Sequence, residues 1–393
     1  MTDTLIHHAL GLHLHQPPDN LRLLLAVNPW EAEEIILCYA RAVRFAQQYR
    51  DVARLHVSFS GILLEQLTDP QLVDRYRHLV DVPAMLNAYR EADNIELLGT
   101  GYYHPIFPLI PRPDWGEQLA HGRAMIERIF GRAPRGFWPP ELAFTMEMIP
   151  ALVQAGYEYV IVDGVHVRPF DGINDSFRPY VACYDGMCIT VVPRDRELSN
   201  AQESGLRLDW FQDELRWRVA GSPRPHAPRL LTSWSGGENG GWFRQHDEPA
   251  GFFGYFFAPY MDWCRSGHAD IVPLHLSDYL AQVRHLPPAR VQAGAWNVGS
   301  SAGVDFSQWC GSTEQQQAVA DIQRLSAYYW TLCQDHPDVW QLAGDTLHTA
   351  RRLILEAETS CFLFWGEAWI PHLYARIAPA EVALRDAETR LRR

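Results

Sequence analysis

The chain has 393 residues, a formal net charge of −13, and 47% hydrophobic against 21% charged residues. This length has room for one large α/β domain and a smaller one, and the acidic balance argues against a nucleic-acid partner, which needs a basic face. No apolar run reaches the roughly 20 residues that span a bilayer, so we expect no membrane partner either.

The N-terminus and the cysteines bear on the cellular compartment. The opening Met-Thr-Asp-Thr-Leu-Ile-His-His lacks the basic and apolar regions of a signal peptide. The seven cysteines are odd in number and scattered, which indicates neither a disulfide framework nor zinc-ribbon spacing. We therefore expect a cytoplasmic protein. Its 14 tryptophans and 12% aromatic residues fit a carbohydrate or aromatic-ligand surface without proving either.

The first predicted element is a strand over residues 5–15, in which leucines alternate with His13 and His15 before Gln16-Pro17-Pro18 ends the run. Period-2 alternation points both imidazoles the same way at the end of the strand. There they could bind a metal ion, hydrogen-bond the hydroxyls of a ligand, or make the ordinary contacts of surface or core histidines.

Helices and strands then alternate along the chain. We expect a helix near 30–49, a strand at 54–60, a helix-rich stretch over 70–92, a strand at 95–100 and a helix over 114–131. The strand at 95–100 carries Glu96 and leads into a turn with Tyr102, Tyr103 and His104.

The stretch Arg135–Phe144 combines an aromatic side chain with a carboxylate. A short apolar run ends in Trp138, and two consecutive prolines stop the strand before Glu141. Such a pair suits a sugar, because the ring stacks on the apolar face of a pyranose while the acid works at the anomeric carbon. The alternative is a capped helix start with a core tryptophan.

The next stretch keeps the same alternation. Residues 146–155 predict a helix, 159–162 a strand that delivers Asp163 to a turn, 178–192 an additional β pair, 197–219 a helix and 229–234 a strand. Polar residues repeatedly follow the strand ends, which is typical of a parallel α/β barrel or open sheet with its site on the C-terminal face.

The strand at 229–234 is followed by a glycine-rich loop over residues 235–243, which allows close approach to a ligand but lacks the Lys-Ser/Thr of a P-loop. Helices are expected at 313–335, 337–352 and 372–392, so a C-terminal helical domain begins near 300. The aromatic-dense stretch Glu356–Trp369 either packs between the domains or helps to wall a sugar cleft.

Five stretches in this order resemble glycoside hydrolase family 57, the α-amylase, 4-α-glucanotransferase and branching-enzyme group. They are His13–Pro17, Glu96–Pro105, Gly136–Glu141, Trp234–Trp242 and Ala357–Gly366. The resemblance covers nearly the whole chain. It implies an incomplete (β/α)7 barrel with helical insertions over residues 1–299 and a C-terminal helical bundle over residues 300–393, packed on the barrel.

The resemblance also implies a retaining mechanism on α-glucosidic bonds, with a nucleophilic Glu and an acid/base Asp. Glu141 falls on the nucleophile position, and Trp138 on a position that stacks on a sugar. Trp365 lies where an aromatic side chain would close the site. The full set of positions expected to contact the sugar is His13, His15, Glu96, Trp138, Trp242 and Trp365.

One position departs from the family pattern. Where the family reads Asp-Gly-Glu, this chain reads Gly236-Gly237-Glu238, and glycine has no proton to give. Because a retaining glycosidase uses two carboxyls about 5 Å apart, loss of the acid removes a factor on the order of 10²–10⁴ in rate. Three explanations remain open: Glu238 substitutes for the acid, another carboxylate such as Asp163 does, or the protein binds α-glucan with little or no cleavage.

A metal-dependent, deacetylase-like or mannosidase-like barrel is a further alternative. It needs His13 or His15, Asp163 and His104 to converge on one ion, and no HxxxH or paired-Asp motif supports it. We therefore expect an α-glucan or maltooligosaccharide substrate, no cofactor and no metal ion.

Overall fold

The computed structural model describes residues 5–224, 227–296, 298, 306–336 and 338–392. Its strands are β1 Ile6–Leu14, β2 Leu55–Phe59, β3 Ile95–Leu98, β4 Gly136–Phe137, β5 Tyr159–Asp163, β6 Val167–Pro169, β7 Tyr180–Tyr184, β8 Met187–Arg194, β9 Arg229–Gly236, β10 Ile271–Pro273 and β11 Ala289–Val291. Its helices are α1 Asn20–Val27, α2 Pro29–Gln48, α3 Gly61–Leu67, α4 Pro70–Tyr76, α5 Val82–Glu91, α6 Arg112–Phe130, α7 Ile149–Gln154, α8 Arg196–Ser204, α9 Leu208–Ala220, α10 Gly240–Phe243, α11 Ala258–Arg265, α12 Leu276–Gln282, α13 Ser307–Cys310, α14 Thr313–Asp335, α15 Val339–Ala357, α16 Ser360–Phe364 and α17 Ile370–Leu391. Within the described ranges, none of these helices has the length and apolar character that crossing a bilayer requires.

Parallel strands form the wall of a barrel that does not close completely. In the described part of the chain, β9, β1, β2 and β3 pair in parallel, a single bridge from Gly99 to Phe137 continues to β4, and β5 and β8 follow. Between β8 and β9 no ladder is recorded among these residues, although Asp195 N–H donates to Thr232 O at 2.8 Å just past the end of β8. The predicted incomplete (β/α)7 barrel with a helical C-terminal region is thereby confirmed.

Aromatic rings fill the inside of the barrel beside β1. The rings of Trp138 and Trp234 are both buried and stacked, with centroids 5.1 Å apart. Gly11 of β1 lies against this stack, so closely that a Cβ atom added there would be 2.0 Å from Cδ2 of Trp234. The tryptophan pair therefore requires a residue without a side chain at this point of β1.

The β7–β8 hairpin differs from the expected additional β pair. Strand β8 belongs to the barrel, because it pairs in parallel with β5, and β7 joins it from outside in antiparallel register. Directly opposite residues of this hairpin, Cys183 and Cys188, form a disulfide that the scattered cysteines did not predict. The pair becomes adjacent only because the turn at Asp185-Gly186 folds the chain back, with both residues at positive φ.

The expected helix over residues 197–219 is divided into two. Helix α8 ends at Gly205, whose φ of 128° ends the helical path, and α9 starts again at Leu208. Glycine adopts this conformation at little cost, whereas residues with a side chain rarely do. Helix α8 therefore ends beside the carboxyl end of β9, where Gln202 donates to Ser235 Oγ.

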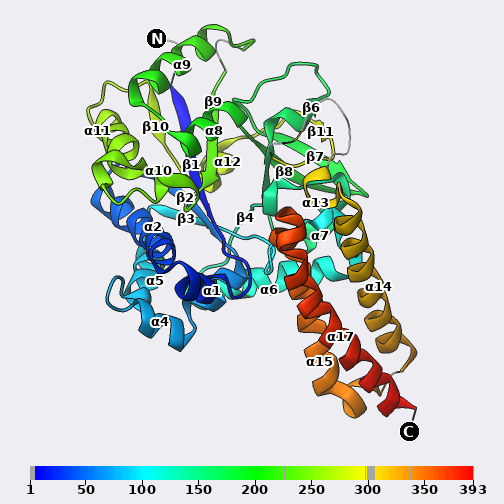
Figure 1. Ribbon diagram of the computed structural model, residues 1–393. Coiled ribbons are helices and arrows are strands. Elements are labelled where there is room, and N and C mark those ends of the chain that lie inside the picture. Colours follow the sequence, from blue (N-terminus) through cyan, green and yellow to red (C-terminus); the bar gives the residue numbers. More distant parts are fainter. Residues whose placement is uncertain (1–4, 225–226, 297, 299–305, 337, 393) are drawn as a thin grey trace.

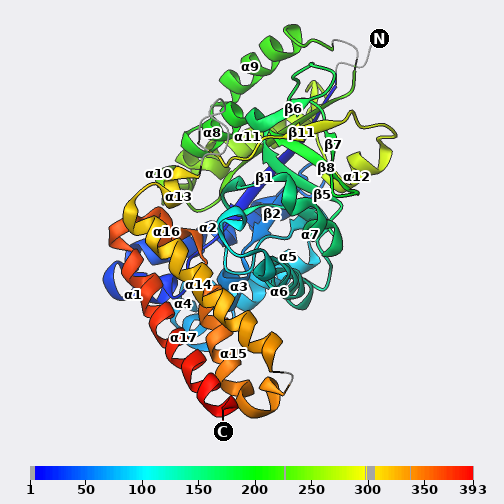
Figure 2. The ribbon, with the colours of Figure 1, turned by 90° about the vertical axis from the view of Figure 1, so that its right-hand side faces the viewer.

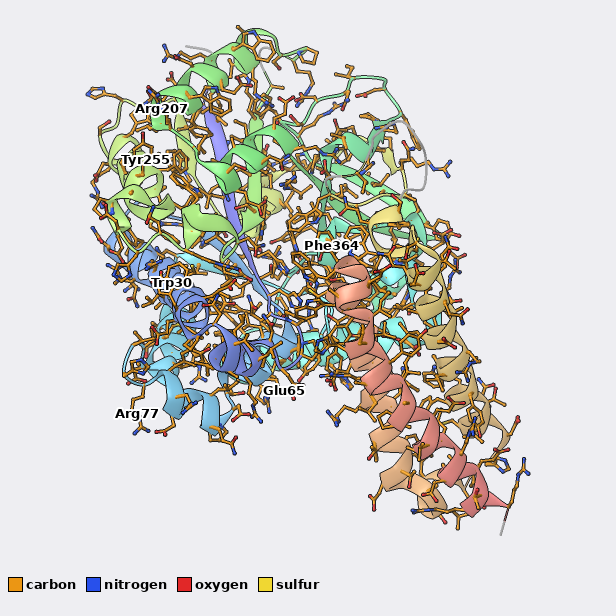
Figure 3. The ribbon with its side chains drawn as sticks, in the orientation of Figure 1. Trp30, Glu65, Arg77, Arg207, Tyr255 and Phe364 are labelled. Atoms are coloured by element: carbon orange, nitrogen blue, oxygen red, sulfur yellow. A yellow bond between two sulfur atoms is a disulfide. The ribbon has the colours of Figure 1, made fainter. Side chains whose placement is uncertain are left out.

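Helices α14, α15 and α17 pack together and extend away from the barrel, with the C-terminus at the far end (Figures 1 and 2). Figure 3 shows Phe364, at the end of α16, where this helical region meets the barrel. The buried carboxylate of Asp114 on α6 anchors the contact, since it accepts hydrogen bonds from Ser326 (2.6 Å) and Trp330 (2.7 Å) and pairs with Arg351 at 2.9 Å. The predicted domain boundary at 299/300 lies outside the described residues.

The packing of Trp234 on β1 makes Gly11→Ala a test of the barrel interior. We expect a loss of about 1–3 kcal/mol in the free energy of unfolding, because the added methyl group overlaps a ring that has no room to move. Gly116→Ala on α6 is the matched control: nothing lies within 4 Å of its added Cβ, and alanine in a helix should stabilise by about 0.5–1 kcal/mol. Urea unfolding of both variants checks the opposite signs, and equal values for both would contradict this description of the barrel.

Candidate active site

Polar side chains gather where the parallel strands end. The register aligns His13 of β1 with Ser58 of β2 on one side and with Gly236 of β9 on the other. Because carboxyl ends of parallel strands meet at one edge, side chains from distant segments converge there. The cluster consists of His13, His15, Ser58, Ser60, His104, Glu141, Glu238, Ser360 and Cys361.

Glu141 is held in an unusual backbone conformation. Two prolines end β4, and Glu141 and Leu142 then adopt φ values of 57° and 52°. The carbonyl of Glu141 accepts a hydrogen bond from Trp296 N–H at 2.8 Å, which fixes the strained turn. Non-glycine residues in this region cost on the order of 1–3 kcal/mol each and cluster at functional sites. The strain is thus an observation that points to function at this residue.

The carboxylate of Glu141 is largely enclosed, with 12% of the side chain exposed. The hydroxyl of Ser360, from α16, donates to Oε1 of Glu141 at 3.0 Å. Burial raises the pKa of Glu141 to about 7, although the hydrogen bonds from Ser360 and Trp296 act in the opposite direction. A carboxyl with this pKa is present in both forms at neutral pH, so its anion is available as a nucleophile.

A chain of hydrogen bonds reaches Glu141 from the inside of the barrel. It runs from Ser58 Oγ to His13 Nδ1 at 2.8 Å, from His13 Nε2 to His104 Nε2 at 2.7 Å, and from His104 Nδ1 to Ser360 Oγ at 2.8 Å. Like Glu141, His104 has a left-handed backbone, with φ 61°, and its carbonyl accepts from Ser360 N–H at 2.9 Å.

The direction of this chain follows from its last member. Since Ser360 donates to Glu141, its oxygen accepts the proton of His104 Nδ1, and His104 Nε2 must then accept from His13 Nε2–H. Burial lowers the pKa of His13 to about 3 and that of His104 well below its usual value, so both rings are neutral and these tautomers are consistent. All donors therefore point towards Glu141 and stabilise its anion.

His15 and Glu238 meet on the other side of the cluster. The backbone N–H of His15 donates to Oε1 of Glu238 at 2.7 Å, while the ring contacts Ser60 Oγ at 2.8 Å and Cys361 Sγ at 3.4 Å. Only 2% of Glu238 is exposed, and burial raises its pKa to about 8. Its Oε2 has no hydrogen-bond partner among the described residues. Glu238 is thus a buried carboxyl, protonated at neutral pH, next to the carboxyl end of β1.

The three tryptophans predicted to contact sugar lie in different surroundings. Trp138 is completely buried and stacks between His13 and Trp234, so it supports the cluster from below. Trp242 is partly buried, donates its indole N–H to Gln202 O at 2.8 Å and packs edge-on against neighbouring aromatic rings. Trp365 is 58% exposed at the end of α16, five residues after Ser360. Of the three, Trp365 offers the open ring face.

Glu96 lies apart from this cluster. Its position on β3 aligns with His56 of β2, two residues before Ser58, and its carboxylate binds Tyr159 OH at 2.6 Å and the backbone and side chain of Ser277. Although burial opposes it, hydrogen bonds from His56, Ser277 and Tyr159 lower the pKa of Glu96 to about 2. Glu96 is thus an ionised carboxylate that holds His56, Tyr159 and Ser277 together inside the barrel.

Asp163, the other carboxylate considered for proton transfer, is buried at the end of β5. It pairs with Arg196 at 2.9 Å and Arg194 at 3.5 Å and accepts Val165 N–H at 3.3 Å. Within the part of the chain that the structure describes, no three His, Cys, Asp or Glu side chains are arranged to hold a metal ion. His13 and His104 do meet, but their rings stack and share a hydrogen bond.

Sequence reasoning missed several members of the cluster. Ser58 and Ser60 alternate at the end of a strand, as His13 and His15 do, and this repeated period-2 pattern is a signal that could have identified them. Ser360 and Cys361 stand inside the stretch already noted for its aromatic residues. Their contact with Glu141 and His15 joins residues more than 200 positions apart, which no local pattern contains.

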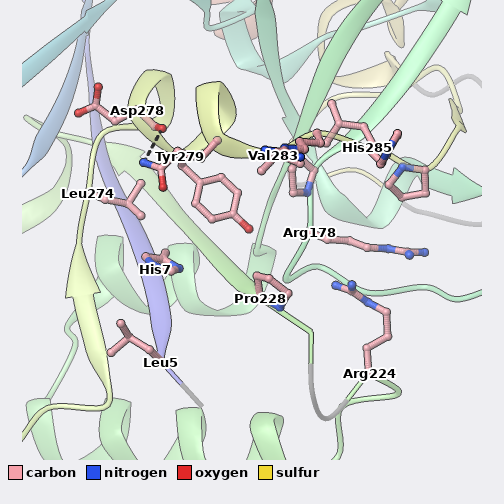
Figure 4. Close-up of a pocket in the computed structure, with 15 residues that line it drawn as sticks. Leu5, His7, Arg178, Arg224, Pro228, Leu274, Asp278, Tyr279, Val283 and His285 are labelled. Atoms are coloured by element: carbon pink, nitrogen blue, oxygen red, sulfur yellow. Dashed lines mark hydrogen bonds between the residues drawn. The ribbon is translucent and has the colours of Figure 1, made fainter. Parts of the chain in front are cut away.

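A separate cavity of about 600 Å³ opens at the other end of β1 (Figure 4). It is lined by Leu5 and His7 from the start of that strand and by Arg178, Arg224 and Tyr279. Both arginines are already paired with aspartates, Arg178 with Asp171 and Arg224 with Asp175. None of the members of the cluster around Glu141 line this cavity, so the candidate active site is at the carboxyl end of the strands.

Comparisons with known proteins point to one family. The sequence model described as glycosyl hydrolase family 57 matches residues 10–215, just over half of the chain. Alpha-amylase 1 of Dictyoglomus thermophilum is 28% identical over 225 residues, which cover 55% of this chain and 30% of that protein. The 4-alpha-glucanotransferase of Thermococcus kodakarensis is 29% identical over 200 residues, covering 49% and 27%. The matches thus span less than a third of the length of these two curated relatives.

A solved structure extends the likeness to almost the whole chain. The branching enzyme of Thermococcus kodakaraensis superimposes with a TM-score of 0.73 at 15% identity, covering 98% of this chain and 90% of the other. At this level of identity the likeness establishes the fold, including the helical C-terminal region.

The raised pKa of Glu141 predicts a pH-dependent cost in stability. The pKa of about 7 in the folded state exceeds the usual 4.5. The free energy of unfolding therefore falls as pH rises from 4.5 to 7, by on the order of 3 kcal/mol in total at pH 8. Glu141→Gln removes this ionisation, so the variant should gain stability relative to the parent between pH 5 and pH 8. Denaturant unfolding at both pH values measures the gain, with the exposed Glu367→Gln as control. A difference between variant and parent that does not change with pH would show that Glu141 is not buried as described.

Proposed function

The chain belongs to glycosyl hydrolase family 57, and we propose that it is a retaining, α-glucan-acting glycosidase or glucanotransferase with Glu141 as its nucleophile. The named relatives, an alpha-amylase, a 4-alpha-glucanotransferase and a branching enzyme, support α-glucan or maltooligosaccharide as the substrate class. They share the cleavage of an α-glucosidic bond and differ in what then accepts the sugar.

The observation that carries this proposal is the setting of Glu141. A nucleophilic carboxylate must be fixed in direction and partly stripped of water, yet held as an anion when the substrate arrives. The left-handed turn fixes the direction, burial strips the water, and the hydrogen-bond chain ending in Ser360 Oγ stabilises the anion. A carboxylate with only a structural role would be better served by an ion pair, such as the one that Asp163 makes with Arg196.

In the proposed reaction, an oxygen of Glu141 attacks the anomeric carbon, the bond from that carbon to the leaving sugar oxygen breaks as this oxygen takes a proton from an acidic group, and a glycosyl-enzyme with inverted configuration forms. Water or a sugar hydroxyl then attacks the same carbon, and the second inversion restores the original configuration. His15, at the partly exposed edge of the cluster, is placed to meet sugar hydroxyls, and Trp365 supplies an open ring for stacking. His13 and Trp138 act from beneath, because both are buried.

A second function remains a candidate because of Gly236. An α-glucan-binding protein on the same barrel needs no proton donor, and the position that carries the acid in the family has no side chain here. Such a protein would bind maltooligosaccharides without turnover. Product analysis on maltooligosaccharides and amylose separates the two functions, since only the enzyme generates new reducing ends or redistributed chain lengths.

Glu141→Gln tests the proposed nucleophile. The amide keeps the size of the side chain but is not a nucleophile, so turnover of maltooligosaccharides should fall by at least about 10³-fold. Binding of maltotetraose to the same variant, measured by titration calorimetry, should stay within a few-fold of the parent protein, because the cluster around it is preserved.

Glu367→Gln, an exposed glutamate in the turn Gly366–Ala368, is the control and should keep both properties. Full activity of Glu141→Gln would remove Glu141 from the mechanism. Loss of binding together with turnover would instead indicate a damaged site.

A further inference from the structure

Helix α8 follows β8 and lies beside β9 (Figure 1). Asp195 N–H, at the start of the helix, donates to Thr232 O at 2.8 Å, and Ser199 Oγ accepts Trp234 N–H at 2.9 Å. Gln202 Nε2 then reaches Ser235 Oγ at 2.9 Å. From Asp195 to Gln202 the helix advances about 10 Å, and from Thr232 to Ser235 the strand advances about the same distance. The two elements therefore lie side by side up to the residue before Gly236.

Glu203 is the next residue of α8. It lies four positions after Ser199 and directly follows Gln202, whose side chain is also fixed to Gly11 O at 3.0 Å. Residues at i and i+4 share a side of a helix, so Glu203 is on the side of α8 that accompanies β9. This placement brings its carboxyl to the level of Gly236, where the family carries its acid.

The surroundings of Glu203 connect it to Glu141. Arg194, whose charge acts on Glu203, donates to Trp234 O at 2.7 Å and lies over the ring of Trp296 at 5.8 Å. Trp296 in turn donates its backbone N–H to Glu141. The charge of Glu203 also reaches both Glu141 and Glu238, where it adds to the rise in pKa.

The carboxyl of Glu203 differs from the two other candidates in its accessibility. It is half-buried, and within the described part of the chain no hydrogen bond or ion pair holds it. Glu238 is enclosed and bound to the backbone of His15, and Asp163 is paired with two arginines. Burial raises the pKa of Glu203 although the charge of Arg194 opposes the rise.

We propose that Glu203 is the general acid/base of this chain, replacing from helix α8 the side chain that β9 lacks at Gly236. This inference rests on the proposed function. As Glu141 bonds to the anomeric carbon, the bond from that carbon to the leaving oxygen breaks, and that oxygen takes the proton of Glu203. The carboxylate of Glu203 then takes a proton from water or an acceptor hydroxyl, whose oxygen displaces Glu141.

Glu203→Gln tests this role through the leaving group. Cleavage of maltotetraose, which expels a sugar hydroxyl, should fall by on the order of 10²–10⁴-fold. Release of 4-nitrophenol from 4-nitrophenyl α-maltoside needs little protonation, so the first turnover of that substrate should fall less than about tenfold. The alkaline limb of the pH profile for maltotetraose should also disappear. Glu197→Gln, on the exposed side of the same helix, is the matched control and should leave all three unchanged.

A second variant asks whether the two positions are equivalent. A Cβ at Gly236 would lie 2.6 Å from Nδ2 of Asn239, an exposed side chain that is able to move away. Gly236→Asp added to Glu203→Gln should therefore recover at least tenfold of the lost maltotetraose activity. The same change in the parent protein should add little, because an acid is already present.

The remaining outcomes each have one meaning. Equal losses on both substrates, no loss on either, or a selective loss in Glu238→Gln would overturn the role of Glu203. So would a parent protein that cleaves the nitrophenyl substrate but not maltotetraose, and in each of these cases Glu141 could still be the nucleophile. If the parent protein cleaves neither substrate, or if Glu141→Gln is fully active, the proposed function itself fails.

Discussion

The hydrogen bond from Ser360 to Glu141 joins the two parts of the molecule at the point where chemistry is proposed. Glu141 comes from the end of a barrel strand and Ser360 from a helix more than 200 residues later. Enclosing a carboxylate in this way is costly unless hydrogen bonds compensate, and the chain through His104 and His13 supplies them. The helical region is therefore part of the site, because its docking through Asp114 places Ser360 correctly.

Burial also separates the carboxyls near the site into one that is paired with arginines and three whose pKa is raised. Asp163 is held by two arginines at Oδ2 and by Val165 N–H at Oδ1, so both of its oxygens already have partners. Glu141, Glu203 and Glu238 each have a raised pKa because burial disfavours the anion, and the charge of Glu203 adds to the rise at the other two. Ionisation of one of these carboxyls therefore disfavours ionisation of the others, which is how a single site can hold a nucleophile beside an acid.

Much of the fold followed from local patterns. The alternation in residues 5–15 and the two prolines before Glu141 identified strand ends, and the ordered motifs predicted the barrel and the helical region that the structure has. Three features lay beyond such patterns. The disulfide depends on which residues face each other across the β7–β8 hairpin, the place of β8 in the barrel depends on its pairing with distant β5, and Glu203 depends on the rise of α8 beside β9. Trp138 and Glu96 were predicted to contact sugar from their place in the family motifs, and this stays a prediction; what the motifs did not contain is that Trp138 is fully buried and that Glu96 binds the hydroxyl of Tyr159.

Trapping the glycosyl-enzyme would show directly which residue is the nucleophile. A fluorinated α-glucosyl fluoride that forms the covalent intermediate quickly and releases it slowly would be incubated with the intact chain, which would then be digested and analysed by mass spectrometry. We expect one added fluoroglucosyl group, carried by the peptide that contains Glu141 and absent after Glu141→Gln. A label on another carboxyl, such as Glu203 or Glu238, would contradict the assignment of Glu141 as the nucleophile.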